Sequence, residues 1–322
     1  MGRPAHSAEP YGPIGAAGLK QRWCGDDRGH MAIDLEHDPR IQRRRDLADR
    51  DPLARRLCLQ DSRGQLGHTM ADVEAQVVDA LGLGQFSLLY QPRFSLQTGD
   101  VVAVEALLRW QDATRRLIRP KAFLPLVAQT SAMVALGQWA LDEACREAAG
   151  WELARPVGAP PLTLSVNLAA QEVLESEFLA RVRLVLDERG LPANLLQFEL
   201  DASDPLRGET LVSARLQILR DAGVRVAIDG ACPQLGIGSP HVEADSVHLH
   251  RRWVRSVACD DRLAARVAAL VDRVHRSGGT VCATGVEAQT QSDVLAAVGC
   301  DHGQGYFYCH PVPSDALGWL GT

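Results

Sequence analysis

The sequence predicts an α/β fold, namely a (β/α)8 barrel of the TIM type preceded by a largely disordered N-terminal arm. Eight short apolar runs recur along the chain, and most of them are followed by a helical segment. Alternating strands and helices form a parallel sheet that helices cover, and eight such units are enough to close a barrel. An open doubly wound sheet is the alternative that the repeating pattern by itself leaves open.

The chain divides into an arm, residues 1–68, and a barrel domain, residues 69–322. The arm carries Arg and Asp of mixed sign, as in Ile41–Asp46, and lacks apolar periodicity, so we expect it to be flexible and mostly disordered. A solvated tail is the simpler interpretation, and a partner-binding arm is the alternative. After the arm, apolar residues three or four apart predict a first helix that ends at Gly82 and Gly84.

The apolar runs are the expected strands, and the hairpin-like spacing of the first two indicates that one strand is antiparallel. In chain order they are Ser87–Tyr90, Val101–Leu107, Leu162–Val166, Leu196–Leu200, Val224–Ile228, Ser246–Leu249, Thr280–Ala283 and, weakest, Gly303–Phe307. The expected helices between them include Leu124–Leu136, Leu141–Trp151, Glu175–Arg189, Thr210–Ala222, Asp261–Ser277 and Gln289–Val298. In a barrel of this type the chemistry lies at the C-terminal ends of the strands.

Composition excludes several classes of protein. The chain has 322 residues, 46% of them hydrophobic, and a formal net charge of -6, whereas general nucleic-acid binding needs a basic face. Its eight cysteines include no C-x-x-C pair, so they indicate neither a zinc site nor a disulfide framework. No apolar stretch is long enough to span a membrane, and no apolar signal core lies near the N-terminus, so we expect a cytoplasmic protein.

Polar side chains end several of the apolar strands, and a barrel brings such strand ends to one rim. Four of them have oxygen ligands and come from four different strands: Glu105, Asn167, Glu199 and Asp229. Oxygen ligands suit a hard cation such as Mg2+ or Mn2+. An acid inside an apolar strand, as Glu105 is, must be paired, ligated or protonated. Taken singly, Glu199 or Asp229 could instead cap a helix or lie in a solvated loop.

A series of ordered motifs resembles the EAL domain family, the cyclic di-GMP phosphodiesterases, over nearly all of residues 72–320. The motifs are Tyr90-Gln91-Pro92, Thr98-Gly99, Glu105-Ala106-Leu107-Leu108-Arg109-Trp110, Phe123-Leu124-Pro125-Leu126, Leu136-Gly137-Gln138-Trp139, Val166-Asn167, Gly285-Val286-Glu287, Gly299-Cys300-Asp301, Gln304-Gly305-Tyr306 and Pro311. Their order and separations match those of the family, whereas a lone Glu-Ala-Leu would mean nothing. The resemblance implies the same barrel, including one antiparallel strand.

The resemblance also implies a metal-dependent chemistry. In active EAL domains two divalent cations activate a water that attacks a phosphodiester of cyclic di-GMP and gives the linear dinucleotide. The ligands of the first cation correspond to Glu105, Asn167, Glu199 and Asp229, and all four are retained. We therefore expect one Mg2+ or Mn2+ at this residual site and no second metal.

The groups that the family uses to hold the second cation and the attacking water are replaced. Gly230 stands where the family has the second of two aspartates, Thr284 where it has a glutamate, and His248 where it has a lysine. Ala202 replaces a further glutamate, and the loop after Asp229 is two residues shorter and lacks the family's F-G-T-G sequence. Catalytic groups typically contribute about 10²–10⁴-fold each, so we assign no catalytic residue and expect turnover to be lost.

His248 and His250 lie two residues apart on one expected strand, so both rings should face the barrel mouth. Beside Asp229 and Glu199, such a pair suits zinc or manganese. The favoured interpretation is that His248 fills the space of the lysine and that His250 hydrogen-bonds a loop.

The anion-binding side of the pocket is retained according to the resemblance. The family positions that line the dinucleotide pocket correspond to Gln91, Leu107, Arg109, Glu287, Gln304 and Pro311. Arg109 is expected to reach a phosphate, and a salt bridge to a neighbouring acid is the alternative. We predict a degenerate EAL signalling protein that binds cyclic di-GMP or an unidentified protein partner, with phosphodiesterase activity lost. The alternative is a weak or active cyclic di-GMP phosphodiesterase.

Overall fold

The computed structural model describes residues 70–111, 117–128, 130–231 and 244–321. The predicted arm, residues 1–68, and its boundary with the barrel domain lie outside the described residues. The loop of residues 232–243, which the family pattern predicts to be short, lies outside them as well.

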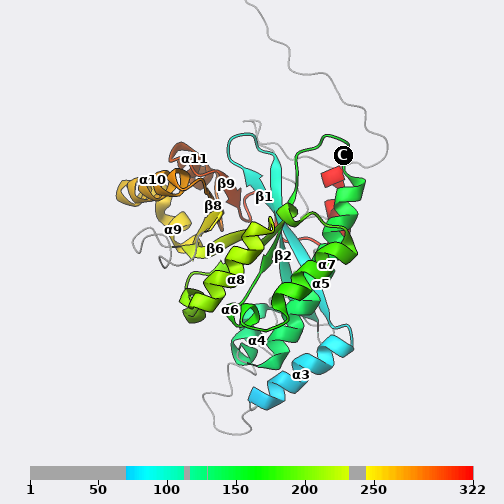
Figure 1. Ribbon diagram of the computed structural model, residues 1–322. Helices are drawn as coiled ribbons and strands as arrows, with labels where there is room; N and C mark the ends of the chain where they lie inside the picture. The colour runs from blue at the N-terminus through cyan, green and yellow to red at the C-terminus, as the bar shows by residue number, and fades with distance from the viewer. Residues whose placement is uncertain (1–69, 112–116, 129, 232–243, 322) are drawn as a thin grey trace, which may run out of the picture.

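The described strands form one closed barrel, which is drawn in Figure 1. They are β1 (Phe86–Ser95), β2 (Val101–Gln111), β3 (Leu117–Ile118), β4 (Thr163–Asn167), β5 (Leu196–Asp201), β6 (Arg225–Ala231), β7 (Ser246–Leu249), β8 (Thr280–Thr284) and β9 (His302–Gln304). The order runs β1-β9-β8-β7-β6-β5-β4-β2, and the short β3 pairs with β2 outside the ring. The barrel closes because β1 pairs with both β2 and β9. The predicted (β/α)8 barrel is confirmed, and the open sheet is excluded.

One strand of the barrel runs against the others. β1 is antiparallel to β2 and to β9, whereas the remaining neighbours in the ring are parallel. The prediction of one antiparallel strand is therefore confirmed. The expected last strand, Gly303–Phe307, is wrong in its second half, because the chain turns after Gly305 and the amide of Tyr308 donates to the carbonyl of Gly305.

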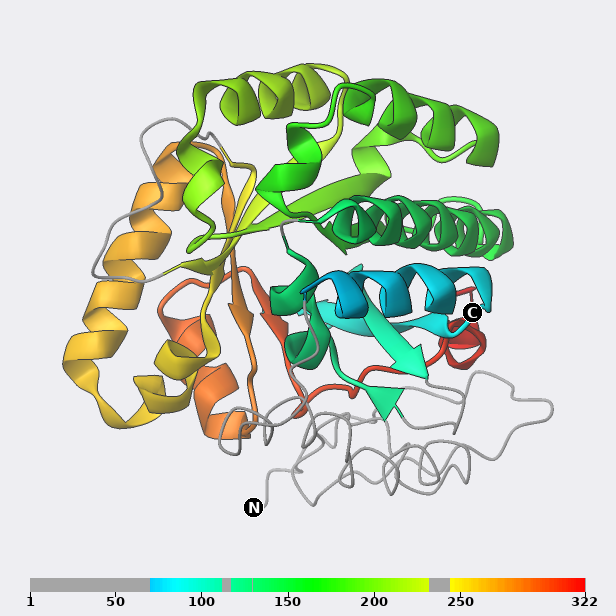
Figure 2. The same cartoon turned by 90° about the horizontal axis from the view of Figure 1, so that it is seen from below.

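Helices surround the strands, as the view in Figure 2 shows. They are α3 (Met70–Gly82), α4 (Pro120–Val127), α5 (Ser131–Ala154), α6 (Ala170–Val173), α7 (Phe178–Arg189), α8 (Thr210–Asp221), α9 (Arg251–Ser256), α10 (Asp261–Arg276) and α11 (Gln289–Ala297). Within the described ranges, no helix is both long enough and apolar enough to cross a bilayer.

The division of the chain around α4 and α5 differs from the prediction. The expected helices Leu124–Leu136 and Leu141–Trp151 are wrong in their boundaries, because α4 ends at Val127 and one helix of 24 residues follows. Thr130 has an extended backbone (φ −115°, ψ 165°) and so begins a new helix. A buried stripe then continues without a break from Ala132 to Ala148, which holds α5 together as one element.

Strand alternation separates an apolar shell from a polar interior. Successive side chains of a strand point to opposite faces. In β5, Phe198 packs on Phe178 of α7, with the ring centroids 5.9 Å apart, and belongs to the core between sheet and helices. The intervening Gln197 and Glu199 point into the barrel, where both are buried. The barrel interior is therefore where ionisable groups meet.

Candidate functional site

The four predicted cation ligands meet at one end of the barrel interior. Asn167 is the register partner of Glu199 on the next strand, and its amide donates to Oε1 of Glu105 over 2.9 Å. Asp229 lies near the end of β6, in register with Asp201 of β5. Glu105, Glu199 and Asp229 together line one cavity of about 210 Å3. The structure thus brings together side chains that the sequence separates by more than a hundred residues.

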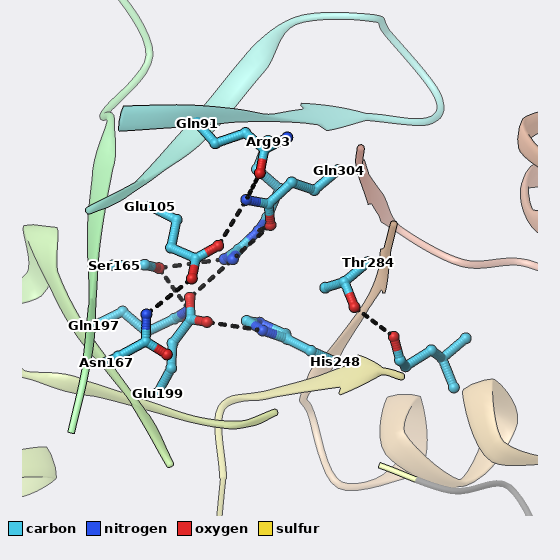
Figure 3. A network of polar contacts seen from close by, with 11 residues as sticks. Gln91, Arg93, Glu105, Ser165, Asn167, Gln197, Glu199, His248, Thr284 and Gln304 are labelled. Carbon is cyan, nitrogen blue, oxygen red and sulfur yellow. Dashed lines mark hydrogen bonds and ion pairs between the residues drawn. The ribbon is translucent and has the colours of Figure 1, made fainter. Parts of the chain in front are cut away.

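A fully buried arginine stands at the centre of this group, and the sequence reasoning missed it. Arg93 of β1 is only 2% exposed. Its guanidinium donates to Oε1 of Glu199 over 2.8 Å, to Oγ of Ser165 over 3.2 Å and twice to Oε1 of Gln304 over 3.2 and 3.3 Å. Figure 3 shows these side chains pointing toward one another inside the barrel. Arg93 therefore connects β1 to β4, β5 and β9.

Glu199 is held as a carboxylate by its neighbours. It is only 3% exposed, and burial alone would raise its pKa. The charge and hydrogen bond of Arg93, together with the nearby imidazole of His248, outweigh burial and place the pKa of Glu199 well below its usual range. Nδ1 of His248 lies 3.3 Å from Oε2 of Glu199, so both carboxylate oxygens have a nitrogen neighbour.

The charges of Glu105 and Asp229 are balanced less completely than the charge of Glu199. Burial, followed by repulsion from Glu199, raises the pKa of Glu105 from 4.5 to about 7. The same two causes raise the pKa of Asp229 from 3.8 to about 6. Both carboxyls therefore hold a proton more readily than exposed acids do, because burial and the negative charge of Glu199 disfavour their ionised forms.

Gly230 and Thr284 supply no acid to the site. Gly230 adopts a left-handed backbone, φ +79°, and a Cβ there would lie 3.9 Å from Oδ1 of Asp201. The hydroxyl of Thr284 donates to the carbonyl of Leu249 over 2.7 Å, so it is held at the wall (Figure 3). Position 230 therefore has space for a Cβ, but its left-handed backbone favours glycine and disfavours a larger residue.

The two histidines of β7 and its end play separate roles. His248 is 0% exposed and lies inside the barrel beside Glu199. Nδ1 of His250 accepts the amide of Arg252 over 3.1 Å and caps the start of α9. His250 therefore caps a helix and does not hydrogen-bond a loop as the favoured interpretation expects, whereas His248 lies in the interior.

The predicted ligand-binding residues line two adjoining cavities. Leu107, Arg109 and Pro311 line a cavity of about 830 Å3. Gln91, Glu287 and Gln304 line the cavity of about 210 Å3. Both cavities include Glu105, Glu199, Arg251 and Tyr306 in their walls, so they form one continuous mouth.

Contacts fix several of these residues in place. Nη1 of Arg109 donates to the carbonyl of Leu108 over 2.7 Å, and among the described residues Arg109 makes no salt bridge to an acid. Gln91 donates to the carbonyl of Cys309 over 2.8 Å, and Gln304 donates to Oε2 of Glu105 over 2.7 Å. Glu287 pairs with Arg255 at the exposed rim, with 3.1 Å between their charged groups.

Two residues of the site were not expected, and each has a sequence signal. Arg93 lies two residues after Gln91 in the first strand, and an ionised side chain on the inner face of a strand must be paired, as was argued for Glu105. Arg251 follows the end of β7, where side chains of a barrel reach the rim. Neither belongs to a motif that the family resemblance uses.

The closed barrel and its acid-rich mouth define a TIM-type barrel whose site lies at the C-terminal ends of the strands. The sequence profile of the EAL domain matches residues 74–311, and the chain belongs to the EAL domain family. The chain is therefore related to proteins named as cyclic di-GMP phosphodiesterases.

The relatives differ in length from this chain. The bifunctional diguanylate cyclase/cyclic di-GMP phosphodiesterase MucR of Pseudomonas aeruginosa is 31% identical over 240 residues, which are 74% of this chain and 35% of MucR. The oxygen sensor protein DosP of Escherichia coli is 28% identical over 255 residues, which are 77% of this chain and 31% of DosP. The chain thus spans about a third of the length of these curated relatives. The solved MucR phosphodiesterase, in complex with cyclic di-GMP, is 30% identical, with a TM-score of 0.68 over 76% of this chain and 99% of that one.

Catalysis in EAL domains generally uses Mg2+ or Mn2+. The contacts of the four predicted ligands show whether their oxygens are free to hold such a cation. Both oxygens of Glu105 accept amide hydrogens, from Asn167 and from Gln304. Both oxygens of Glu199 face Arg93 and His248. In the part of the chain that the structure describes, no three His, Cys, Asp or Glu side chains are grouped so that they could hold a metal ion. As arranged, the donor set does not fit a bound cation.

Proposed function

We propose that the chain is a degenerate EAL signalling protein of the cytoplasm, which regulates by binding cyclic di-GMP and has lost phosphodiesterase activity. The observation that carries the proposal is a contrast within one barrel mouth. Arg109 lines a cavity of about 830 Å3, within the usual range for small-molecule sites. The positions of Gly230, His248 and Thr284, by contrast, supply neither the acids nor the amine that EAL hydrolysis uses.

Individual basic side chains on the cavity wall offer partners to a doubly anionic ligand. Four basic side chains line the larger cavity: Arg109, Arg119, Lys121 and Arg251. Five acids line it as well, and of these Arg93 balances the charge of Glu199, so the support comes from single basic groups and not from the net charge. A flat guanidinium such as that of Arg109 can make two parallel hydrogen bonds to a phosphate. The relative MucR, at 30% identity, has been solved with cyclic di-GMP, which supports the same ligand here.

The contacts of the acids support the loss of hydrolysis. A hydrolytic centre of this class must lower the pKa of a water and balance the charge of the leaving oxygen. Here Glu105 and Glu199 are engaged by amide, guanidinium and imidazole groups, none of which can ionise water as a metal does. The single Mg2+ or Mn2+ that the sequence predicts at Glu105, Asn167, Glu199 and Asp229 is not carried into the proposal, because the donor set as arranged does not fit a cation.

A weak phosphodiesterase is the second candidate, because Glu105, Glu199 and Asp229 share one cavity in which negative charge is in excess. A cation would relieve that excess. Binding of a protein partner in place of the dinucleotide is the third candidate function. Binding of nucleic acid is not proposed, because the chain is acidic.

Calorimetry should detect binding of cyclic di-GMP to the full chain, and Arg109→Ala should weaken it about 10–100-fold. The reason is the loss of a charge-assisted hydrogen bond to phosphate. Arg189→Ala is the matched control, because Arg189 pairs with Asp142 on the outer surface and lines neither cavity. If wild-type protein gives no heat of binding, the dinucleotide is not the ligand and the protein-partner role is favoured.

Incubation of cyclic di-GMP with the purified protein and Mn2+ or Mg2+ should yield no linear dinucleotide above the background of a no-enzyme control. The expectation follows from the missing groups at positions 230, 248 and 284. Product is followed by anion-exchange chromatography. Clear turnover that Glu105→Ala abolishes would refute the loss of activity and establish the weak-phosphodiesterase alternative.

A further inference from the structure

The guanidinium of Arg93 is hydrogen-bonded by side chains from three other strands. It lies on the inner face of β1, and its acceptors come from β4, β5 and β9: Ser165, Glu199 and Gln304. One of these acceptors, Ser165, has a second hydrogen bond: its Oγ also accepts Nε2 of Gln197 over 3.0 Å. A planar guanidinium with hydrogen bonds in several directions is fixed in orientation as well as in charge.

The same contacts extend to the second acid of the cluster. The Gln304 amide accepts from Arg93 through Oε1 and donates through Nε2 to Glu105 over 2.7 Å. The position of Glu105 thus depends on Arg93 through one intervening side chain (Figure 3). Arg93 does not reach the ligand cavity, since it is 2% exposed and lines neither cavity wall. The role of Arg93 is therefore to position Gln304 and Glu105 and to neutralise the charge of Glu199.

A divalent cation at Glu199 would have to displace this arrangement. Oε1 is bound by Arg93, and Oε2 faces His248. An arginine does not lose its proton in a protein, so the guanidinium stays positive and repels a cation beside it. Because Arg93 is enclosed, a cation would also leave a buried positive charge without its partner.

We propose that the Arg93 guanidinium takes the place of a divalent cation at Glu199, so that this EAL barrel balances its central charge without metal. The inference concerns the same site as the proposed function but does not depend on dinucleotide binding. A guanidinium supplies charge without ionising water, so a barrel balanced in this way can hold an anion and not hydrolyse it. The competing view is that Arg93 is only a core ion pair and that a cation binds at Glu105 and Asp229 regardless.

The test is a titration of the full chain with Mn2+ alone, followed by electron paramagnetic resonance of the free ion. Wild-type protein should show no saturable site, and its melting temperature should be the same in Mn2+ and in EDTA. Arg93→Met should bind one Mn2+, with affinity raised about tenfold or more over wild type by removal of the like charge. Arg93→Lys keeps the charge and should resemble wild type, and Arg189→Met controls for the loss of an ion pair elsewhere.

A wild-type site that holds one Mn2+ at micromolar concentration and disappears in Glu105→Ala would overturn the proposal. A folded Arg93→Met protein that gains no Mn2+ would overturn it too. If Arg93→Met does not fold, the wild-type titration and Arg93→Lys decide the matter alone. No dinucleotide is present, so the result stands whether or not cyclic di-GMP binding is found.

Discussion

Arg93→Met should lower the free energy of unfolding by about 3–5 kcal/mol, the cost of removing one partner from a buried ion pair. The substitution leaves the Glu199 carboxylate, 3% exposed, without its guanidinium, removes one of the two donors to Ser165 and removes the donor to Oε1 of Gln304. Urea unfolding of the full chain, followed by circular dichroism, measures the change. Arg189→Met removes an exposed pair with Asp142 and should cost about 0–1 kcal/mol.

A double-mutant cycle separates the pair from its surroundings. Glu199→Gln alone leaves Arg93 charged and buried, so it should also destabilise the fold. The double variant Arg93→Met with Glu199→Gln removes both charges, and its loss of stability should be about 1–3 kcal/mol smaller than the sum of the single losses. Additive losses would mean that the two side chains do not act as a pair.

Glu172→Gln should stabilise the protein at pH 8, by up to about 3 kcal/mol, and leave its stability near pH 4.5 unchanged. Glu172 of α6 is 7% exposed, and its carboxylate lies against Gly137 of α5, where any other residue would place a Cβ into it. Its oxygen Oε1 accepts the amide of Ala169 over 3.0 Å. Burial raises the pKa of Glu172 from 4.5 to about 7, and that difference corresponds to about 3 kcal/mol.

The direction of the pH effect follows from proton counting. Between pH 4.5 and about 7 the folded protein binds the proton of Glu172 more readily than the unfolded chain does. The contribution of Glu172 to stability is therefore fully present below pH 4.5 and is lost as the pH rises through about 7. Glutamine stays neutral and still accepts the Ala169 amide, so the difference between variant and wild type should grow across this window.

Urea midpoints at intervals between pH 4.5 and 8 measure that difference. Glu188→Gln is the control, because Glu188 is exposed on α7. Parallel curves for wild type and Glu172→Gln would show that the buried carboxyl does not titrate in this range.

The local pattern of apolar residues predicted most of the fold. Seven of the eight expected strands occur at their predicted places, because a short apolar run between turn residues has few other ways to bury its side chains. The exceptions are the weak run at Gly303–Phe307, which turns after Gly305, and the division between α4 and α5. In both places the decisive contact is a turn or an extended residue that hydrophobic periodicity does not encode.

The candidate site was predicted in part. Strand-end position placed Glu105, Asn167, Glu199 and Asp229 at one rim, because parallel strands in a barrel align their ends. Nothing in the sequence reasoning placed Arg93 among them. Its partner Glu199 is 106 residues away in the chain and Gln304 is 211 residues away.

By itself, the sequence determined that this chain is an EAL-type barrel, because strand patterns and motifs are local facts. From side-chain identities it also predicts that positions 230, 248 and 284 lack the groups that EAL hydrolysis uses. Only the tertiary structure decided how the remaining acids are neutralised. Arg93 and Glu199 meet because closure of the ring by β1 brings both side chains into the barrel interior, where they are almost fully shielded from solvent. Charge balance in a buried space depends on which groups the whole fold brings within hydrogen-bonding distance, and no short stretch of sequence contains that information.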